Sequence, residues 1–314
     1  MTVPIRTTFD TATNKDLLKV GTLRKIFDST IRKRVSEYQN MYKVSTTKLY
    51  QNTDTELAGF EYANEFGEGQ NIPLQGPQRG SDKTYTQRYF GTGFRMTFAM
   101  DFFNQYGLWK RWAKQLGDVM AESMDDEFAT IWNNPTSTTL TCGTGFDTLA
   151  LASASHTGLL PVVTTENYSN YANAALSHTA LKNARYHFAT LVDAMGHKTG
   201  GMVKGDTLYF EPTLWPTVEE LLGSEGIPYE FSNTINITRK MGLKPFEYHR
   251  LTSTTAWGIL AKKSDLYDVN AIISLKPRMF TKDAPDNTQD KIITAMMFFT
   301  YGWGSPRGVY VGKT

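Results

Sequence analysis

The amino-acid sequence predicts a mixed α+β fold, and three features of the chain lead to this prediction. Apolar residues recur every three or four positions from Leu108 to Trp132, which is the spacing of one face of a long helix. Residues 54–98 alternate as two long strands would, around a tip rich in glycine and proline. Short apolar runs near 257–261, 272–275, 292–301 and 308–311 are typical of buried strands.

The composition allows a large core and argues against several classes of protein. Of the 314 residues 40% are hydrophobic, and 18 Phe, 16 Tyr and 6 Trp can serve a core or contacts with other chains. The 33 Lys and Arg nearly balance the 31 Asp and Glu, so specific DNA binding is not expected, because each bound phosphate needs a cation. Cys142 is the single cysteine, which excludes an internal disulfide and a multi-cysteine zinc site.

Neither a secretory signal nor a membrane segment is expected. The first ten residues lack the apolar centre of a signal peptide, and no run approaches the roughly 18 apolar residues that a spanning helix needs. We therefore expect a protein that is soluble and intracellular when it is synthesised.

Residues 22–38 are predicted to form an amphipathic helix with one basic face. Its apolar positions follow helical spacing and are Leu23, Ile26, Phe27, Ile31, Val35 and Tyr38. The basic face carries Arg24, Lys25, Arg32, Lys33 and Arg34. Two interpretations stay open, an ordinary solvated face and a face turned toward nucleic acid.

The segment 54–98 is predicted to be a two-stranded ribbon with an irregular tip between 67 and 80. Because an isolated ribbon of this length is marginal in water, and no other part of the chain offers obvious cover, we expect another subunit to cover it. The candidate contact residues are Phe60, Tyr62, Tyr85, Tyr89, Phe90 and Phe94.

The strongest helical pattern covers residues 108–132 and predicts a rod of roughly 40 Å. It should end at Asn133, because Asn134 and Pro135 follow. We expect its apolar stripe to pack against the terminal strands, with Trp109, Trp112, Leu116 and Phe128 in the core.

The chain lacks a recognisable catalytic or cofactor motif. The five histidines have no metal-site spacing, no Gly-x-Ser-x-Gly sequence is present, and the glycine pairs at 91–93 and 143–145 lack the other positions of a nucleotide loop. Asp125, Asp126 and Glu127 fit a solvated helix face. A hydrolase built around His156, with Ser153 or Ser155 nearby, is the remaining alternative, weighed against a hydrogen-bonded structural histidine. We expect no enzyme, no cofactor and no metal.

Three segments carry a resemblance to a known family. Residues 97–107 read Thr-Phe-Ala-Met-Asp-Phe-Phe-Asn-Gln-Tyr-Gly before the long helix. Residues 147–156 end in Ser-Ala-Ser-His and are followed by Tyr168-Ser-Asn170, while 212–222 and 233–236 read as a short helix and an asparagine-containing loop. In this order the segments resemble the major capsid proteins of tailed bacteriophages with the Johnson fold (the HK-ninety-seven type), and in detail the Mu-like major head subunits.

The resemblance implies an architecture. Residues 1–45 would be an N-terminal arm and 46–98 an extended hairpin loop. Residues 99–160 and 271–314 would form a peripheral domain with the spine helix, and 161–270 an axial domain. In some relatives a hairpin lysine is cross-linked to a neighbour, and Lys83 would be the candidate here.

It also implies a function. The chain would self-assemble into hexamers and pentamers of an icosahedral shell around double-stranded DNA, assembled in the bacterial cytoplasm and found in the virion. Expected partners are other copies of the chain, a portal, a separate scaffolding protein, a decoration protein, and packaged DNA bound without sequence preference by the basic face; no membrane is involved. The alternative within the same fold is an encapsulin-like cellular nanocompartment.

Overall fold

The computed structural model describes residues 11–57, 59–76, 79–103, 106–156, 168–193, 195–198, 203–226, 235–263, 267–284 and 290–313. The chain forms two compact units. The first contains Met1–Ser36, Arg88–Asp125 and Ile273–Phe299, and the second contains Glu37–Gln87, Asp126–Ile272 and Thr300–Thr314. The predicted α+β class is confirmed, while the assignment of peripheral and axial domains stays a prediction.

The first unit packs helices against a sheet of long strands. Its elements are α1 (Thr11–Lys33), β4 (Arg88–Met96), α3 (Phe98–Phe102), most of α4 (Tyr106–Asn133) and most of β9 (Val269–Asp283) and β10 (Lys291–Trp303). The sheet order is β1-β9-β10-β4, with β1 at Lys43–Thr46, and β4 runs antiparallel to β10.

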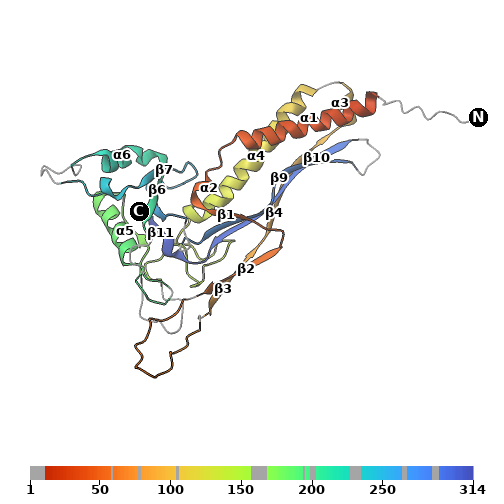
Figure 1. Ribbon diagram of the computed structural model, residues 1–314. Coiled ribbons are helices and arrows are strands. Elements are labelled where there is room, and N and C mark those ends of the chain that lie inside the picture. The colour runs from red at the N-terminus through yellow and green to blue at the C-terminus, as the bar shows by residue number, and fades with distance from the viewer. Residues whose placement is uncertain are drawn as a thin grey trace, which may run out of the picture. The chain divides into compact units, whose positions relative to one another are not determined.

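Helix α1 lies along α4, as Figure 1 shows in red and yellow. Leu23 and Phe27 of α1 are buried. A Cβ atom at Gly117 of α4 would lie 3.3 Å from the carbonyl oxygen of Phe27, so glycine lets the two helices approach closely. The helix predicted for 22–38 ends earlier, at Lys33, which leaves Val35 81% exposed instead of on the apolar face.

The predicted ribbon 54–98 is wrong in its second strand. Strand β2 (Gln51–Leu57) pairs antiparallel with β3 (Arg79–Thr86), and the chain then passes at Gln87 into β4, which pairs with β10. The buried positions change at this junction from odd numbers (Tyr85 and Gln87) to even numbers (Met96), so one strand with a single buried face does not describe the segment. Gly91 and Gly93 mark the difference, because a Cβ there would lie 3.1 and 2.4 Å from carbonyl oxygens of β10.

The second unit is built on a five-stranded mixed sheet with the order β5-β11-β8-β6-β7. The strands are β5 (Tyr171–Ala172), β6 (Gly205–Phe210), β7 (Lys244–Glu247), β8 (Trp257–Ala261) and β11 (Val309–Gly312). The helices are α2 (Tyr38–Met41), α5 (His178–Thr190) and α6 (Trp215–Gly223), with 3-10 turns at Pro212–Leu214, Arg239–Met241 and Pro306–Gly308. Strand β8 is antiparallel to both of its neighbours, whereas β5 and β7 are parallel to theirs.

Aromatic residues fill the core of the second unit around the last turns of α4. Phe128 is fully buried, with ring centroids of Tyr38, Tyr42 and Tyr301 at 4.4, 5.2 and 5.5 Å. Trp132 contacts Tyr42 in the same cluster. The C-terminal end of the spine helix is therefore held by interlocking rings, which are worth more than their buried area alone.

The other three residues that the sequence predicted for the core face of the long helix, which is α4, lie in the first unit. Trp109 and Leu116 are buried, whereas Trp112 is half-buried and packs edge-on against Phe94 at 5.5 Å. The apolar stripe is therefore wider than the buried face of the helix, because β4 covers only one side of Trp112.

Candidate functional site

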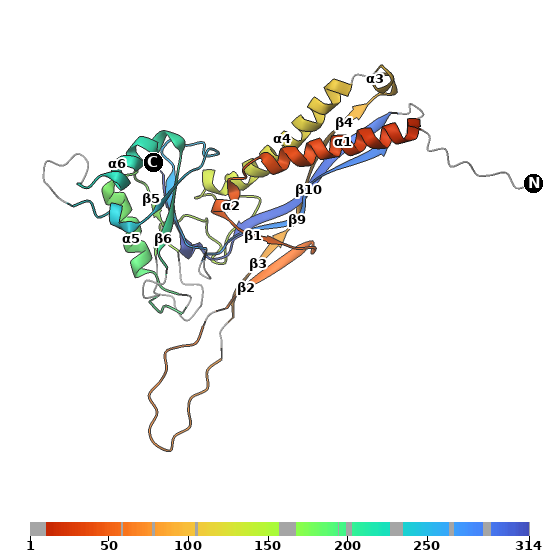
Figure 2. The ribbon, with the colours of Figure 1, turned by 45° about the horizontal axis from the view of Figure 1, so that its top comes forward.

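The hairpin β2–β3 carries a long tip with several exposed apolar side chains. We call residues 59–76 the hairpin tip; they contain no strand, and Figure 2 shows them extending beyond the ends of β2 and β3. Two further residues of the predicted tip, 77 and 78, lie outside the described part of the chain. The apolar side chains exposed along the tip and at its start are Leu57, Phe60, Tyr62, Phe66, Ile72 and Leu74. So many large apolar side chains exposed on one segment are typical of a contact site for another molecule.

A buried lysine holds the root of the hairpin. The Nζ atom of Lys83 donates to the carbonyl oxygens of Cys142 and Thr144, each at 2.6 Å, and lies 5.9 Å from the ring centre of Trp303. Burial lowers the pKa of Lys83. Gly143 between the two carbonyls has a φ of 69°, which places both oxygens toward the ammonium group. Lys83 is 7% exposed, so its position does not suit the cross-link that the resemblance suggested.

A buried ion pair holds the other strand. Nη1 of Arg307 lies 3.1 Å from Oε1 of Glu56 on β2, and the two side chains are 3% and 8% exposed. Burial raises the pKa of Glu56, although the positive charge of Arg307 opposes this shift. A Cβ atom at Gly80 would lie 2.9 Å from Oε2 of Glu56, so β3 must carry glycine opposite this carboxylate. Both strands of the hairpin are thus fixed to the second unit by buried charges.

Four of the six predicted contact residues are not on the exposed hairpin surface. Tyr85 is buried at the hairpin root, 1% exposed, beside Gly302. Tyr89, Phe90 and Phe94 belong to β4, where Phe90 stacks on a phenylalanine of β10 and Tyr89 meets another edge-on. Phe60 and Tyr62 are exposed on the tip as expected for contact residues, but their role is untested.

The basic residues of α1 have different surroundings. Arg24, Lys25, Arg32 and Lys33 are exposed, and Arg24 reaches the carbonyl oxygen of Met279 at 3.4 Å. Arg34 is half-buried and pairs with Glu122 of α4 at 2.9 Å. Four of the five positions therefore offer charge to a partner, whereas Arg34 serves the contact between the two helices.

His156 belongs to a buried network that the sequence pattern did not reveal. Its Nδ1 lies 2.5 Å from Asp147 and its Nε2 2.9 Å from Oδ1 of Asn170. The amide of Asn170 is fixed, because its Nδ2 donates to the carbonyl oxygen of Leu151 at 2.7 Å. Among the described residues no serine hydroxyl is a hydrogen-bond partner of His156, so its geometry suits a structural histidine and not the base of a hydrolase.

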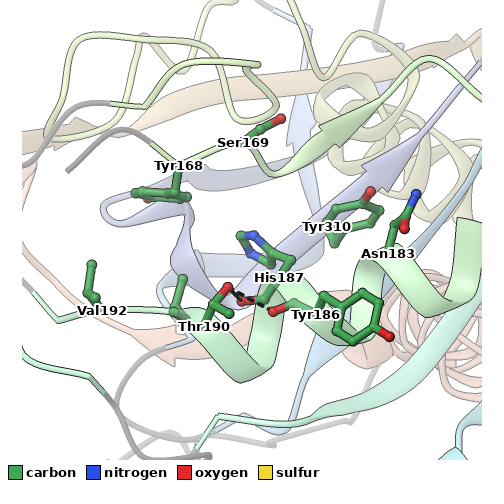
Figure 3. Close-up of a pocket in the computed structure, with 9 residues that line it drawn as sticks. Tyr168, Ser169, Asn183, Tyr186, His187, Thr190, Val192 and Tyr310 are labelled. Carbon is green, nitrogen blue, oxygen red and sulfur yellow. Dashed lines mark hydrogen bonds between the residues drawn. The ribbon is translucent and has the colours of Figure 1, made fainter.

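A pocket of about 380 Å³ lies beside this network and is drawn in Figure 3. Tyr168, His187 and Tyr310 are among its lining rings, together with polar groups of α5 such as Asn183 and Thr190. Burial lowers the pKa of His187 to about 4, so the imidazole is neutral at pH 7. Sequence periodicity gave no signal for this pocket, because its lining residues come from separate segments.

The described residues contain neither a metal-binding cluster nor a membrane-spanning helix. No group of three or more His, Cys, Asp or Glu side chains in these residues could hold a metal ion. No helix within the described ranges is long and apolar enough to cross a membrane.

Comparisons with known proteins agree with the fold. By sequence, no curated protein matches the chain. Its structure is similar to the capsid of cyanophage P-SCSP1u (TM-score 0.58, 12% identity, 89% of this chain and 88% of that chain). It is also similar to the virus-like particle of Pyrococcus furiosus (0.54, 8%, 93% and 98%) and to the procapsid of bacteriophage JBD30 (0.53, 11%, 96% and 75%). These likenesses show the fold alone.

The family follows from the sequence itself. Residues 81–312 match the family model described as phage capsid protein, which is more than half of the chain. The matched range begins in β3 and runs through α4 to β11, and it leaves out α1, α2, β1 and β2. The chain belongs to the phage capsid protein family.

Proposed function

We propose that this capsid protein is the major head subunit of a tailed phage of the Mu-like group. In this proposal it self-assembles into hexamers and pentamers of an icosahedral shell around double-stranded DNA, in the cytoplasm of the bacterial host. The family match and the fold support a shell-forming role. Rings of this kind use heterologous contacts, in which one surface of a subunit meets a different surface of the next.

One observation carries the proposal: the hairpin has a fixed root and a tip with exposed apolar side chains. Lys83 and the Glu56–Arg307 pair hold both strands, while six large apolar side chains remain exposed beyond them. Burying one such side chain fully contributes about 1.5–3 kcal/mol. An arm that is fixed at one end and apolar at the other is suited to clasp a neighbouring subunit.

The basic face of α1 would serve the interior of the shell. Packaged DNA needs counter-charge without sequence reading, and Arg24, Lys25, Arg32 and Lys33 are exposed cations. The net charge of +2 for the whole chain suggests a weak contact. A portal, a separate scaffolding protein and a decoration protein are the further partners in this proposal.

Replacement of the hairpin tip tests the proposal. A variant with Asn-Gly in place of residues 59–76 keeps the β2–β3 pairing and should fold as a subunit, but negative-stain microscopy should find no closed shells. A second variant keeps all 18 residues of the tip and replaces only its apolar side chains by Ser. It separates the loss of apolar contact from the loss of length. If both variants build normal shells, the hairpin is not the clasp and the proposal is wrong.

The alternative is an encapsulin-like compartment, since the Pyrococcus furiosus particle has a similar fold. The contents of purified shells separate the two functions. Nucleic acid inside, with portal and terminase genes nearby, supports the phage head, whereas a cargo enzyme supports the compartment.

A further inference from the structure

The pocket at α5 has a buried floor and an exposed polar rim. Its floor includes His187, Leu191 and Tyr310, which are 9%, 2% and 5% exposed. Its exposed rim consists of Ser169, Asn183, Tyr186 and Thr190. All nine lining residues belong to the second unit, so the pocket lies within one compact part of the chain.

The imidazole of His187 has one nitrogen without a partner. Its Nε2 is buried and has no hydrogen-bond partner among the described residues. Backbone oxygens of Ser169 and Arg307 accept from the ring, which leaves Nε2 as the nitrogen without the proton. Figure 3 shows the ring projecting from α5 into the space among Tyr168, Ser169 and Tyr310. Because an unpaired buried acceptor destabilises a protein, a donor that reaches Nε2 from the pocket is favoured.

The lining of the pocket is uncharged. Burial lowers the pKa of His187 to about 4, so Nε2 presents a lone pair near pH 7. The nine lining residues include no Asp, Glu, Lys or Arg. The guanidinium group of Arg307 lies 5.9 Å from the ring centre of Tyr168, but it is paired with Glu56. A charged ligand would lose its hydration without gaining a counter-charge, so a neutral ligand is favoured.

Aromatic rings flank the unpaired nitrogen. The ring centroids of Tyr168 and Tyr310 lie 5.9 and 5.4 Å from that of His187, and such rings pack well against a further aromatic ring. The volume of about 380 Å³ exceeds the roughly 150 Å³ that holds one benzene molecule. It also falls within the range of about 300–1,000 Å³ that is usual for small-molecule pockets. The space therefore suits a ligand of one or two rings.

We propose that this pocket binds an uncharged aromatic ring of the phenol or indole class, whose O–H or N–H donates to Nε2 of His187. Tyr168 and Tyr310 contact the ring, and the exposed amide of Asn183 at the rim offers a bond to a second polar group. The ring belongs either to a free molecule or to a tyrosine or tryptophan side chain of another chain, and its chemistry is the same in both cases. The site is a property of the subunit and goes beyond its role in a shell.

Water is the competing partner of Nε2. A water molecule would satisfy the nitrogen but would gain little from the faces of Tyr168 and Tyr310, whereas a ring with a donor uses both. A metal ion is disfavoured, because His187 is the only histidine in the lining and no carboxylate or thiol accompanies it there.

A pair of probes tests the donor requirement without any variant. Indole and benzofuran have nearly the same size and shape, but benzofuran has a ring oxygen in place of the N–H group. Ligand-observed NMR titrations with the full-length subunit should give indole a dissociation constant of about 0.1–1 mM, as suits a ligand of this size. Benzofuran should bind roughly tenfold more weakly, because it cannot donate to Nε2.

A variant then assigns the acceptor. His187→Phe keeps an aromatic ring but removes the nitrogen, so indole should bind as weakly as benzofuran does. The matched control is His178→Phe, which makes the same exchange on the same helix. Nε2 of His178 is also buried without a partner among the described residues, but His178 does not line the pocket. This control should leave the preference for indole unchanged.

A third probe separates the two sources of the ring. N-acetyltryptophan amide carries the indole ring together with backbone amides. Binding at least as tight as that of indole supports a side chain of another chain as the natural occupant, whereas clearly weaker binding supports a free molecule.

Three results overturn the inference. The first is no saturable binding of indole at millimolar concentration, and the second is equal affinity for indole and benzofuran. The third is a folded His187→Phe variant that still prefers indole. In each case the shell-forming role is untouched, because none of these measurements depends on assembly.

Discussion

Removing Arg307 should destabilise the hairpin root in a way that depends on pH. Arg307→Met keeps the volume of the side chain but leaves Glu56 buried without its cation. Removing one partner of a buried pair costs ~3–5 kcal/mol. We expect about 3 kcal/mol at pH 7, near the lower end, because Glu56 can avoid the buried charge by taking up a proton.

The direction of the pH effect follows from the pKa of Glu56. Burial already raises this pKa in the folded protein, so the folded state binds the proton more tightly than the unfolded state does. Stability contributed by this group therefore increases as the pH falls through the folded pKa. Loss of Arg307 removes the main opposing charge and raises the pKa further, so the penalty of Arg307→Met should be smaller at pH 5 than at pH 7.

Urea unfolding of dissociated subunits at the two pH values measures this penalty. The control is Glu56→Leu with Arg307→Met, which removes both charges and should lie within about 1 kcal/mol of the original protein. If Arg307→Met alone were as stable as the double variant at pH 7, the ion pair would not hold the hairpin root and the reasoning would be refuted.

Three further predictions concern single side chains. Phe128→Ala should lower the free energy of unfolding by ~3–5 kcal/mol and Trp112→Ala by clearly less, because Phe128 is fully buried and Trp112 is not; equal losses in urea unfolding would contradict this. Gly80→Ala should cost ~1–3 kcal/mol by displacing Glu56, whereas Gly76→Ala, with no atom within 4 Å of the added Cβ, should cost far less in the same assay. Because the folded pKa of His187 is about 4, stability should fall between about pH 6.5 and pH 4, and the His187→Phe variant should show a flatter pH profile of unfolding.

The spine helix was the element most open to prediction from the sequence. Its apolar stripe persists over many turns, and the sequence Asn133-Asn134-Pro135 stops it where the structure ends α4. Both signals are local, so no knowledge of tertiary contacts was needed. The exposure of Trp112 could not be predicted in the same way, because it depends on how far β4 covers the helix.

The hairpin was predicted with the wrong partner strand for a physical reason. Alternation tells which side chains share a face but not which strand lies next to them. At Gln87 the backbone changes sheets without a proline or a turn sequence to mark the junction, so Tyr89, Phe90 and Phe94 appeared to continue the ribbon. Only Gly91 and Gly93 signalled a close neighbour, and they could not identify it as β10.

The buried charges of the second unit could not be predicted from the sequence at all. Asp147, His156 and Asn170 come from separate loops, and Glu56 meets Arg307 across 251 positions of the chain. Their positions matter for function, because a hairpin held only by its two strands would be marginal in water. Buried charges tolerate few geometries, since each must keep its partner, so they hold both strands of the hairpin to the rest of the second unit.

Lys83 is, for the same reason, better suited to holding the hairpin than to reacting with a neighbour. A lysine nucleophile must be deprotonated and reach its target, and burial does lower the pKa of Lys83. Its Nζ, however, donates to two carbonyl oxygens at 2.6 Å, which stabilises the protonated form and directs the group away from the exposed tip. Releasing it would leave both carbonyls of the 142–144 loop without this donor, at about 1–3 kcal/mol each. The lysine thus belongs to the fixed root, and the contact with a neighbour belongs to the acidic and aromatic tip beyond it.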